Sequence, residues 1–281
     1  MNAPVAPTVL FLSPHLDDVA FSCGGTAARL AAAGVRCHVL TLFTRSVPRP
    51  AGFALACQTD KGIPADVDYL ALRRAEDAAA MRALGAEPVY GSLPEAPHRG
   101  YGSAAELFGP LREGDDGIVL EAAAVIASAV ASSAPALVVA PLGMGGHVDH
   151  RQALRALAVA GIRAPVTGYR DTPYALRDPL APPAPEWTWG DAGAAIPLDP
   201  PALAARLAAC AAYATQLPYQ FARDAPPGTD PAAAMRARLS AFARAEGAGR
   251  PAERFAGTLD ALAVLTALFG GERRRRAGSQ P

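Results

Sequence analysis

The 281-residue chain lacks the features that mark nucleic-acid-binding, membrane-spanning or disulfide-rich proteins. Its 26 basic and 26 acidic residues cancel, so bulk charge favours neither nucleic acid nor an acidic membrane. No apolar run approaches the roughly 18 residues needed to cross a bilayer. The four cysteines lack the paired spacing of a zinc motif or a disulfide framework. The residues before Pro14 carry no basic charge, unlike a secretory signal. We therefore expect a cytoplasmic protein with a small-molecule partner, no nucleic acid and no membrane span.

Short apolar segments alternate along the chain with segments of helical periodicity. The expected strands cover residues 8–13, 36–43, 87–90, 136–140 and 166–169. The expected helices follow Gly24-Gly25 and cover residues 70–84, 118–130 and about 150–160. This alternation predicts a Rossmann-like α/β fold: an open, mostly parallel sheet of order 3-2-1-4-5 with helices on both faces.

Three long connections leave the carboxyl ends of predicted strands, at residues 44–67, 92–116 and 170 to about 200. Connections of this length are usually functional, so we expect them to form pocket walls. We predict one domain over residues 1–281, in which 1–178 form the sheet core with the motifs and about 200–270 form a small helical section. The proline-rich DPLAPPAPEW could instead be a linker before that section.

Two polar clusters follow predicted strands. PHLDD at residues 14–18 follows the first strand, and GHVDH at residues 146–150 follows the fourth. These two strands are neighbours in the expected order. The chain runs outward from them in opposite directions, and open α/β sheets bind ligands beyond the carboxyl ends of such a strand pair. Imidazole and carboxylate are usual ligands of catalytic zinc, and in each cluster two of them stand three residues apart and turn the same way. A lone pair of this kind more often caps a helix or lies in the core. Two such pairs at one sheet edge predict a shared metal site.

These residues also resemble a known family. PHLDDVAFSCGGT and GGHVDH are similar to the two signature motifs of the PIG-L/LmbE-like zinc-dependent N-deacetylases, and RRAEDAAAMRALGA and YRDTPYA add to the likeness. The resemblance covers roughly residues 8 to 176. It implies a bound Zn²⁺, for which another transition metal such as Fe²⁺ or Co²⁺ could substitute. It also implies removal of the N-acetyl group from amino sugars of glycolipids, thiol cofactors or glycosylated natural products.

The resemblance gives roles to six side chains. The implied metal ligands are His15, Asp18 and His150. Asp17 matches the general base that takes a proton from the attacking water. His147 matches the residue that stabilises the oxyanion, and Asp149 matches the carboxylate that tunes it. His147 and Asp17 are the two candidates for protonating the leaving amine.

The chain departs from the family pattern at two positions. Many members have glutamate where Val19 stands, and some have an aromatic residue where this chain has Gly145. The second departure puts in doubt a tyrosine donor from that position, and with it any inference about one particular family substrate.

Three residues outside the motifs are candidate substrate contacts: Arg73, Arg99 and Tyr101. Arg73 could bind a sugar hydroxyl or a phosphate, or it could be an exposed helix arginine paired with Asp77. Arg99 and Tyr101 leave the same two interpretations open. Trp187 and Trp189 are more often packing residues than sugar platforms.

A nucleotide-binding protein could share this fold. However, CGGT at residues 23–26 is not GxGxxG, and no acidic residue ends the second strand to bind a ribose. A non-catalytic glycan-binding homologue would not need Asp17, so the presence of this residue favours an enzyme. We therefore predict a metal-dependent N-deacetylase, a hydrolase of carbon–nitrogen bonds other than peptide bonds, acting on an N-acylated amino sugar or its glycoconjugate. An amidase acting on a non-sugar amide stays open as the alternative.

Overall fold

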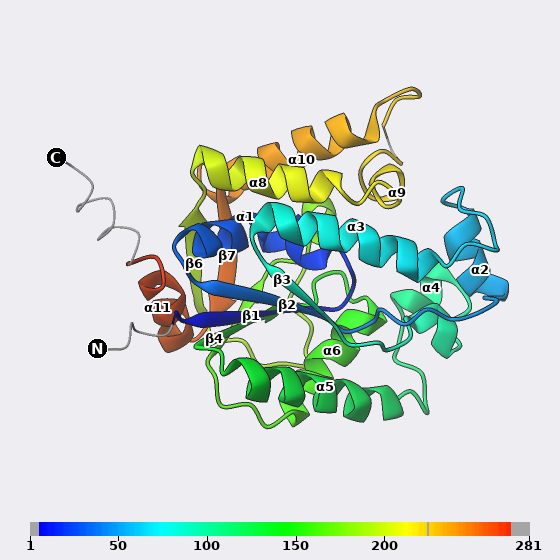
Figure 1. Cartoon of the computed structure of the whole chain (residues 1–281), viewed down its shortest axis with the longest axis horizontal. Coiled ribbons are helices and arrows are strands. Elements are labelled where there is room, and N and C mark those ends of the chain that lie inside the picture. The colour runs from blue at the N-terminus through cyan, green and yellow to red at the C-terminus, as the bar shows by residue number, and fades with distance from the viewer. Residues whose placement is uncertain (1–5, 224, 271–281) are drawn as a thin grey trace.

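The computed structural model describes residues 6–223 and 225–270, which form one seven-stranded sheet with helices on both faces (Figure 1). The strands are β1 (Thr8–Ser13), β2 (Arg36–Thr41), β3 (Glu87–Tyr90), β4 (Leu137–Pro141), β5 (Val166–Tyr169), β6 (Ala192–Pro197) and β7 (Ala252–Gly257). Their order is β3-β2-β1-β4-β5-β7-β6. The strands from β3 to β5 in this order are parallel to one another, and β7 is antiparallel to both β5 and β6. The predicted α/β sheet and its order 3-2-1-4-5 are confirmed.

The helices lie in two layers (Figure 1). One face of the sheet is covered by α1 (Asp18–Ala32), α3 (Tyr69–Leu84) and α8 (Pro200–Ala211), and the other by α5 (Gly117–Ser133) and α6 (Val148–Val159). The remaining helices are α2 (Gly52–Thr59), the 3-10 helix η1 (Ala96–Arg99), α4 (Ala104–Leu107), α7 (Tyr174–Arg177), α9 (Leu217–Phe221), α10 (Pro231–Glu246) and α11 (Leu259–Ala267). No helix of the described residues is long and apolar enough to cross a membrane.

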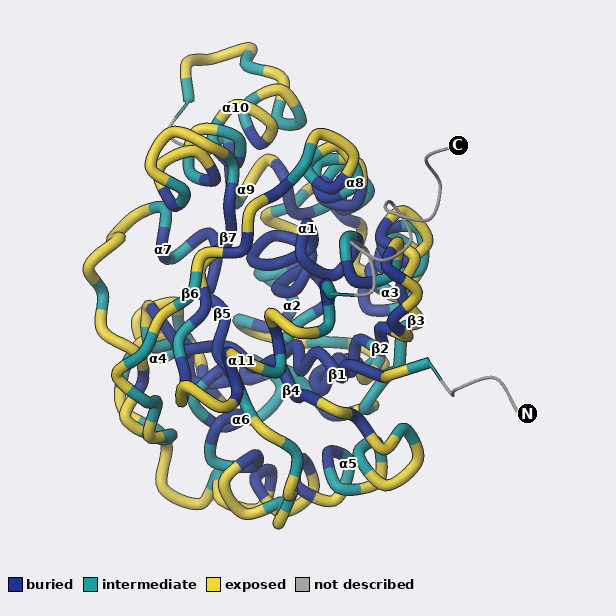
Figure 2. The backbone as a smooth tube through the Cα atoms, turned by 90° about the vertical axis from the view of Figure 1, so that its left-hand side faces the viewer, coloured by how far each residue is buried: buried dark blue, intermediate teal, exposed yellow. Residues whose placement is uncertain are grey.

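The central strand β1 explains why the sheet needs both helical layers. All six of its residues are buried, and Figure 2 shows β1 and its neighbour β4 in the dark blue of buried residues. Val9 and Phe11 pack into the cluster that includes α1, α3 and α8, while Leu10 and Leu12 pack into the cluster that includes α5 and α6. A strand that is apolar on both faces is typical of a parallel sheet covered on both sides.

The carboxyl-terminal section differs from the sequence-based expectation. It contains the expected helices, but it also adds β6 and β7 to the edge of the main sheet. The sequences AGAAIP and AERFAG are rich in alanine and glycine, which are poor strand formers, so neither strand carries a strong signal. DPLAPPAPEW lies in the connection between α7 and β6. The organisation of residues 1–281 as a single domain stays a prediction.

Strand β7 also caps the second half of helix α1 through a side chain. The backbone of α1 leaves helical geometry at Cys23, and its second half therefore begins with free N–H groups. The carboxylate of Glu253 accepts from the N–H groups of Gly25 (3.0 Å) and Thr26 (2.7 Å). Arg206 of α8 lies 3.3 Å from the same carboxylate, and both side chains are buried. Glu253 thus acts as a helix cap and as the counter-charge of a buried arginine.

We expect Glu253→Ala to lower the free energy of unfolding by about 3 kcal/mol, because it leaves Arg206 buried without its counter-charge and two helix N–H groups without an acceptor. Denaturant unfolding of the purified protein measures this change. Glu121→Ala, at an exposed position of α5, is the matched control and should change stability by less than about 0.5 kcal/mol. Equal stability of the two variants would contradict the capping role.

Candidate metal centre and active site

The two polar clusters meet at the carboxyl edge of β1 and β4, which are paired neighbours. The ring of His15, in the loop after β1, lies 4.9 Å from the ring of His147 and 5.3 Å from that of His150. One nitrogen of each imidazole lies within 4.8 Å of the other two. Residues 132 or more positions apart in the chain therefore share one site, as the strand order predicted.

The inner atoms of this cluster fit a metal ion. Oδ2 of Asp18 lies 3.5 Å from Nδ1 of His15 and 3.4 Å from Nε2 of His150. Ligand atoms bound at about 2.1 Å to a tetrahedral metal stand roughly 3.4 Å apart, so these separations match a ligand set. Nε2 of His150 is buried and has no hydrogen-bond partner among the described residues. An unpaired buried nitrogen of this kind is what a metal ligand leaves when the ion is removed.

Two carboxylates fix the outer nitrogens of the same histidines. Nδ1 of His150 donates to Asp171 at 2.6 Å, and Nε2 of His15 donates to Asp149 at 2.9 Å. Each contact places the proton on the outer nitrogen and leaves the inner lone pair free. Carboxylates in this position orient histidine ligands and raise their basicity. The Asp149 carboxylate thus contacts His15, whereas the resemblance had linked it to His147.

The electrostatics of the centre favour a positive charge. Burial opposes charge on both imidazoles, but hydrogen bonds to Asp149 and Asp18 raise the pKa of His15 well above its ordinary value. The pKa of His150 is raised, against burial, by the charge of Asp18 and the hydrogen bond to Asp171. Burial likewise favours the acid form of Asp18, yet the charges of His150 and His15 lower its pKa to about 2. An ionised carboxylate between two imidazoles suits a divalent cation.

Asp17 is the neighbour of Asp18 in the chain, but its carboxylate contacts Arg73 instead of the histidines. It is only 6% exposed, and burial raises its pKa to about 6 even though the charge of Arg73 opposes this. Nη2 of Arg73 lies 3.4 Å from Asp17, and Nη1 donates to Glu95 at 2.7 Å. Arg73 is buried and does not pair with Asp77, whose carboxylate instead accepts from two tyrosines. Its contacts make Arg73 a residue that positions Asp17.

His147 is the N-cap residue of α6 and is buried. Its Nδ1 accepts the N–H of Asp149 at 3.1 Å. Burial and the charge of His15 lower the pKa of His147 to about 3. Because Nδ1 accepts that N–H, the neutral imidazole carries its proton on Nε2 and can donate a hydrogen bond from that nitrogen.

Arg99 and Tyr101 belong to a buried network. Arg99 donates to Asp149 at 2.8 Å and to Asp115 at 2.9 and 3.1 Å. The Tyr101 hydroxyl donates to Asp115 at 3.0 Å and accepts the N–H of Arg112 at 3.1 Å, and Tyr101 is 1% exposed. The structure therefore brings Arg99 to the site as the support of Asp149 and gives Tyr101 no open surface for a substrate.

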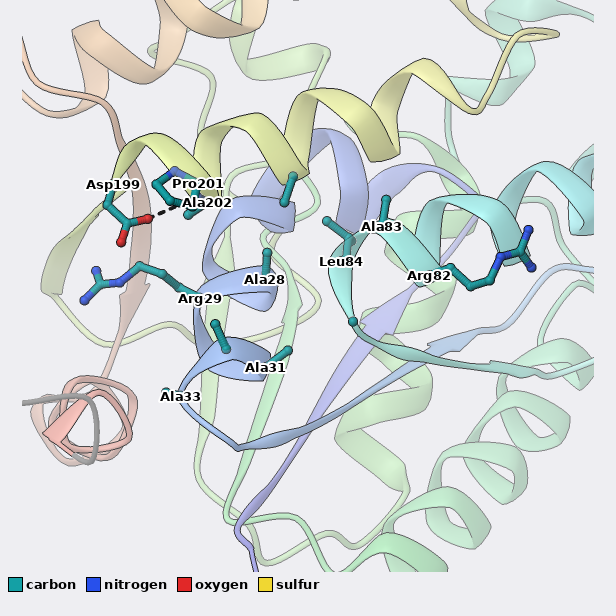
Figure 3. A pocket seen from close by; sticks show the side chains of 13 residues that line it. Ala28, Arg29, Ala31, Ala33, Arg82, Ala83, Leu84, Asp199, Pro201 and Ala202 are labelled. Atoms are coloured by element: carbon teal, nitrogen blue, oxygen red, sulfur yellow. Dashed lines mark hydrogen bonds between the residues drawn. The ribbon is translucent and has the colours of Figure 1, made fainter. Parts of the chain in front are cut away.

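Two cavities among the described residues lie apart from the metal centre, and neither is lined by its residues. A groove of about 750 Å³ lies between the carboxyl ends of α1 and α3 and the start of α8 (Figure 3). Alanines form most of its wall, and Asp199 at its rim accepts the N–H of Ala202. Trp187 and Trp189 line a separate cavity of about 280 Å³ and pack against the core below α5 and α6.

Comparison with known proteins agrees with this geometry. The family described as "PIG-L: GlcNAc-PI de-N-acetylase" matches residues 10–161, more than half of the chain, including both polar clusters. The chain belongs to this family. The 2'-N-acetylparomamine deacetylase of Streptomyces fradiae is 38% identical over 175 residues, which is 59% of this chain and 57% of that protein. The protein of the same name from Niallia circulans is 32% identical over 189 residues, 59% of this chain and 66% of that protein. The chain thus matches less than two thirds of either relative.

A solved structure extends the likeness over more of this PIG-L family chain. The zinc-inhibited form of teicoplanin deacetylase Orf2 superposes with a TM-score of 0.74 at 25% identity. The match covers 89% of this chain and 97% of the other. The family resemblance stated from the motifs is confirmed, and members of the family are metal-dependent, in agreement with the ligand cluster.

Two neighbours of this cluster were not singled out in the sequence. Asp171 follows the end of β5, the strand beside β4, so the rule that pointed to the two polar clusters also points to it. Phe108, 47% exposed, stands 5.3 Å from the ring of His147 and comes from a long loop without a local signal.

We expect Asp171→Ala to weaken metal binding by about 10- to 100-fold, because His150 loses the contact that fixes its orientation. Chelator competition with Zn²⁺ or Co²⁺ measures the dissociation constant. Asp178→Ala, at an exposed position in the same connection, should bind metal like the unchanged protein. Metal affinity that does not respond to Asp171→Ala would show that His150 is held by other means or is not a ligand.

Proposed function

We propose that this protein is a metal-dependent N-deacetylase that hydrolyses the N-acetyl group of an amino sugar in a glycoside. One observation carries the proposal: the buried, metal-compatible set of His15, Asp18 and His150 lies directly beside Asp17, whose pKa is raised to about 6. A set of three protein ligands leaves a coordination position open for water, which distinguishes catalytic from structural zinc sites.

The relatives support an amino-sugar substrate. Two of them are named for deacetylation of 2'-N-acetylparomamine, and the structural neighbour is a teicoplanin deacetylase. We propose a substrate of the same class, an N-acetylated amino sugar carried on a larger molecule. Zn²⁺ is the proposed ion, with Fe²⁺ or Co²⁺ as substitutes, and the cytoplasm is the proposed location.

The catalytic roles follow from what each side chain touches. A bound ion would polarise the acetyl carbonyl and lower the pKa of a water from about 15.7 toward 7. Asp17 takes the proton from the attacking water, and Arg73 holds its carboxylate in place. Asp17 then returns that proton to the leaving nitrogen. His147 does not suit this acid role, because its Nδ1 already accepts a backbone N–H.

We propose that His147 stabilises the charge that develops on the acetyl oxygen. Its Nε2–H is a neutral donor, fixed by the N-cap contact at Nδ1. Preset donors of this kind stabilise the oxyanion without reorganisation during the reaction. Asp149 and Arg99 support the opposite side of the centre through His15.

We propose that two features near the centre contact the rest of a glycoside. Phe108 presents an exposed ring next to His147. On the side of Arg73, a cavity of about 290 Å³ is lined by Tyr69, Gln58 and His98, and Arg73 lies 5.7 Å from the ring of Tyr69. Aromatic and polar walls together are typical of sites for small polar ligands.

A panel of N-acylated amino sugars, their glycosides and non-sugar acetamides tests the proposal by measuring amine release. We expect turnover of at least one N-acetyl amino sugar. Asp17→Asn should keep the bound metal and lower kcat by about 10²-fold or more, because the general base is lost. Release from non-sugar amides alone would favour the alternative substrate class. Full turnover by Asp17→Asn, or loss of its metal, would contradict the role of Asp17.

The two histidines of GGHVDH separate metal binding from catalysis. His150→Ala should lower metal content markedly, because three ligands fall to two. His147→Ala should keep nearly normal metal content and lower kcat by about 10²- to 10³-fold with little change in KM. Elemental analysis and steady-state kinetics on both variants decide between the roles. Metal lost with His147→Ala and kept with His150→Ala would reverse the two assignments.

A further inference from the structure

Two acidic side chains stand where helical spacing would let them pair with Arg73. Glu76 and Asp77 follow Arg73 by three and four positions in α3, and residues with this spacing are neighbours on the surface of a helix. In the part of the chain that the structure describes, Arg73 makes no ion pair with either of them. Its guanidinium instead contacts Asp17 at 3.4 Å and Glu95 at 2.7 Å. The support of Asp17 therefore depends on what keeps two nearer carboxylates away from Arg73.

One segment after α8 binds both of these carboxylates. The hydroxyl of Tyr213 donates to Oδ1 of Asp77 at 2.7 Å. The hydroxyl and the N–H of Thr215 donate to the two oxygens of Glu76 at 2.7 and 2.9 Å. Figure 1 shows α8, which ends just before this segment, lying beside α3. The carboxyl-terminal section thus occupies both acidic residues that could compete for Arg73.

Asp77 is the stronger competitor because it is buried. It is 1% exposed, and the hydroxyl of Tyr90 gives it a second hydrogen bond, to Oδ2 at 3.1 Å. Burial raises the pKa of Asp77 to about 6, although the hydrogen bonds from Tyr213 and Tyr90 lower it. The carboxylate is therefore ionised at neutral pH. A buried carboxylate needs hydrogen-bond donors, and the two tyrosine hydroxyls supply one to each of its oxygens.

Arg73 keeps a donor that could bind this carboxylate instead. Its two Nη atoms face Glu95 and Asp17, but its Nε is buried and has no hydrogen-bond partner among the described residues. Against the effect of burial, the charge of Arg73 also lowers the pKa of Asp77, so the two side chains lie within range of each other. A buried carboxylate that lost one hydrogen bond would gain most from the nearest cation.

We infer that Tyr213 and Tyr90 are positioning residues for the reaction, because they hold the carboxylate of Asp77 away from Arg73. The inference rests on the proposed function, in which Arg73 holds the general base Asp17. Loss of a tyrosine hydroxyl draws the guanidinium toward Asp77, and the carboxylate of Asp17 then loses its fixed orientation toward the attacking water. A misplaced base slows the chemical step more than it weakens substrate binding.

Tyr213→Phe tests this role because it removes one hydroxyl and keeps the aromatic ring in the core. We expect kcat to fall by about 10-fold, with a nearly unchanged KM and unchanged metal content. Asp77→Asn alone should match the unchanged protein, because its amide can accept from Tyr213 and donate to Tyr90. The double variant Tyr213→Phe/Asp77→Asn should recover most of the lost kcat, because the competing charge is gone. Tyr219→Phe, at a tyrosine that is 42% exposed, is the matched control.

A crystal structure of Tyr213→Phe gives a readout that does not depend on activity. It should show Arg73 in an ion pair with Asp77 and no longer with Asp17. If Tyr213→Phe does not fold, Tyr90→Phe takes its place, since it removes the other donor at a half-buried position of β3. It should lower kcat in the same direction, with the same recovery on adding Asp77→Asn.

The outcomes separate this inference from the proposed function. Suppose that the unchanged protein deacetylates an amino sugar but the double variant is no more active than Tyr213→Phe. The tyrosine then has only a packing role, and the inference is wrong while the function stands. A Tyr213→Phe protein whose kcat stays within about twofold, or whose Arg73 still contacts Asp17, leads to the same conclusion. If no N-acetyl amino sugar releases its amine, the proposed function fails, and the crystal structure alone decides whether Asp77 competes for Arg73.

Discussion

The centre depends on two short hydrogen bonds that fix which nitrogen of each histidine carries the proton. Asp149 accepts from the outer nitrogen of His15 and Asp171 from that of His150, so the inner lone pairs converge on Asp18. Without these contacts each ring could turn or change tautomer, and the ligand set would be lost. The arrangement carries its own cost, because both carboxylates are buried. Hydrogen bonds from Arg99 and from the N–H of Ala96 stabilise the buried charge of Asp149, and the N–H of Met144 stabilises that of Asp171.

The order of the parallel strands could be predicted from the sequence because the alternation of apolar and helical segments leaves few topologies. That order makes β1 the central strand, which is enough to bring PHLDD and GHVDH to one edge of the sheet. The two antiparallel strands could not be predicted in the same way. β6 and β7 are held by pairing with each other and with β5, and their alanines and glycines carry little preference for extended backbone.

The sequence singled out most of the side chains that the structure brings together at this edge, but not all their contacts; their roles stay a prediction. Residue type and spacing indicate that His15, Asp18 and His150 can bind a metal, since that depends on local chemistry. The partner of Arg73 depends on how α3 faces the loop after β3, which no local pattern encodes. The exposed pair with Asp77 was plausible from helical spacing, yet tertiary packing buried Arg73 against Asp17 and Glu95. The partner of Asp149 was misplaced for the same reason.

The attachment of Glu253 to the kinked first helix sets an order of assembly for the whole molecule. The carboxylate and the N–H of Gly25 are 228 positions apart, and the helix that they stabilise begins at Asp18, one of the candidate metal ligands. A growing chain therefore contains PHLDD before β7, and the helix that follows PHLDD acquires its cap only after β7 has been made. Contacts of such long range are slow to form, because a large loop must close before any of them contributes. All residues of the centre precede β7 in the chain, so the second half of the helix that starts at Asp18 is capped by a segment made after all of them.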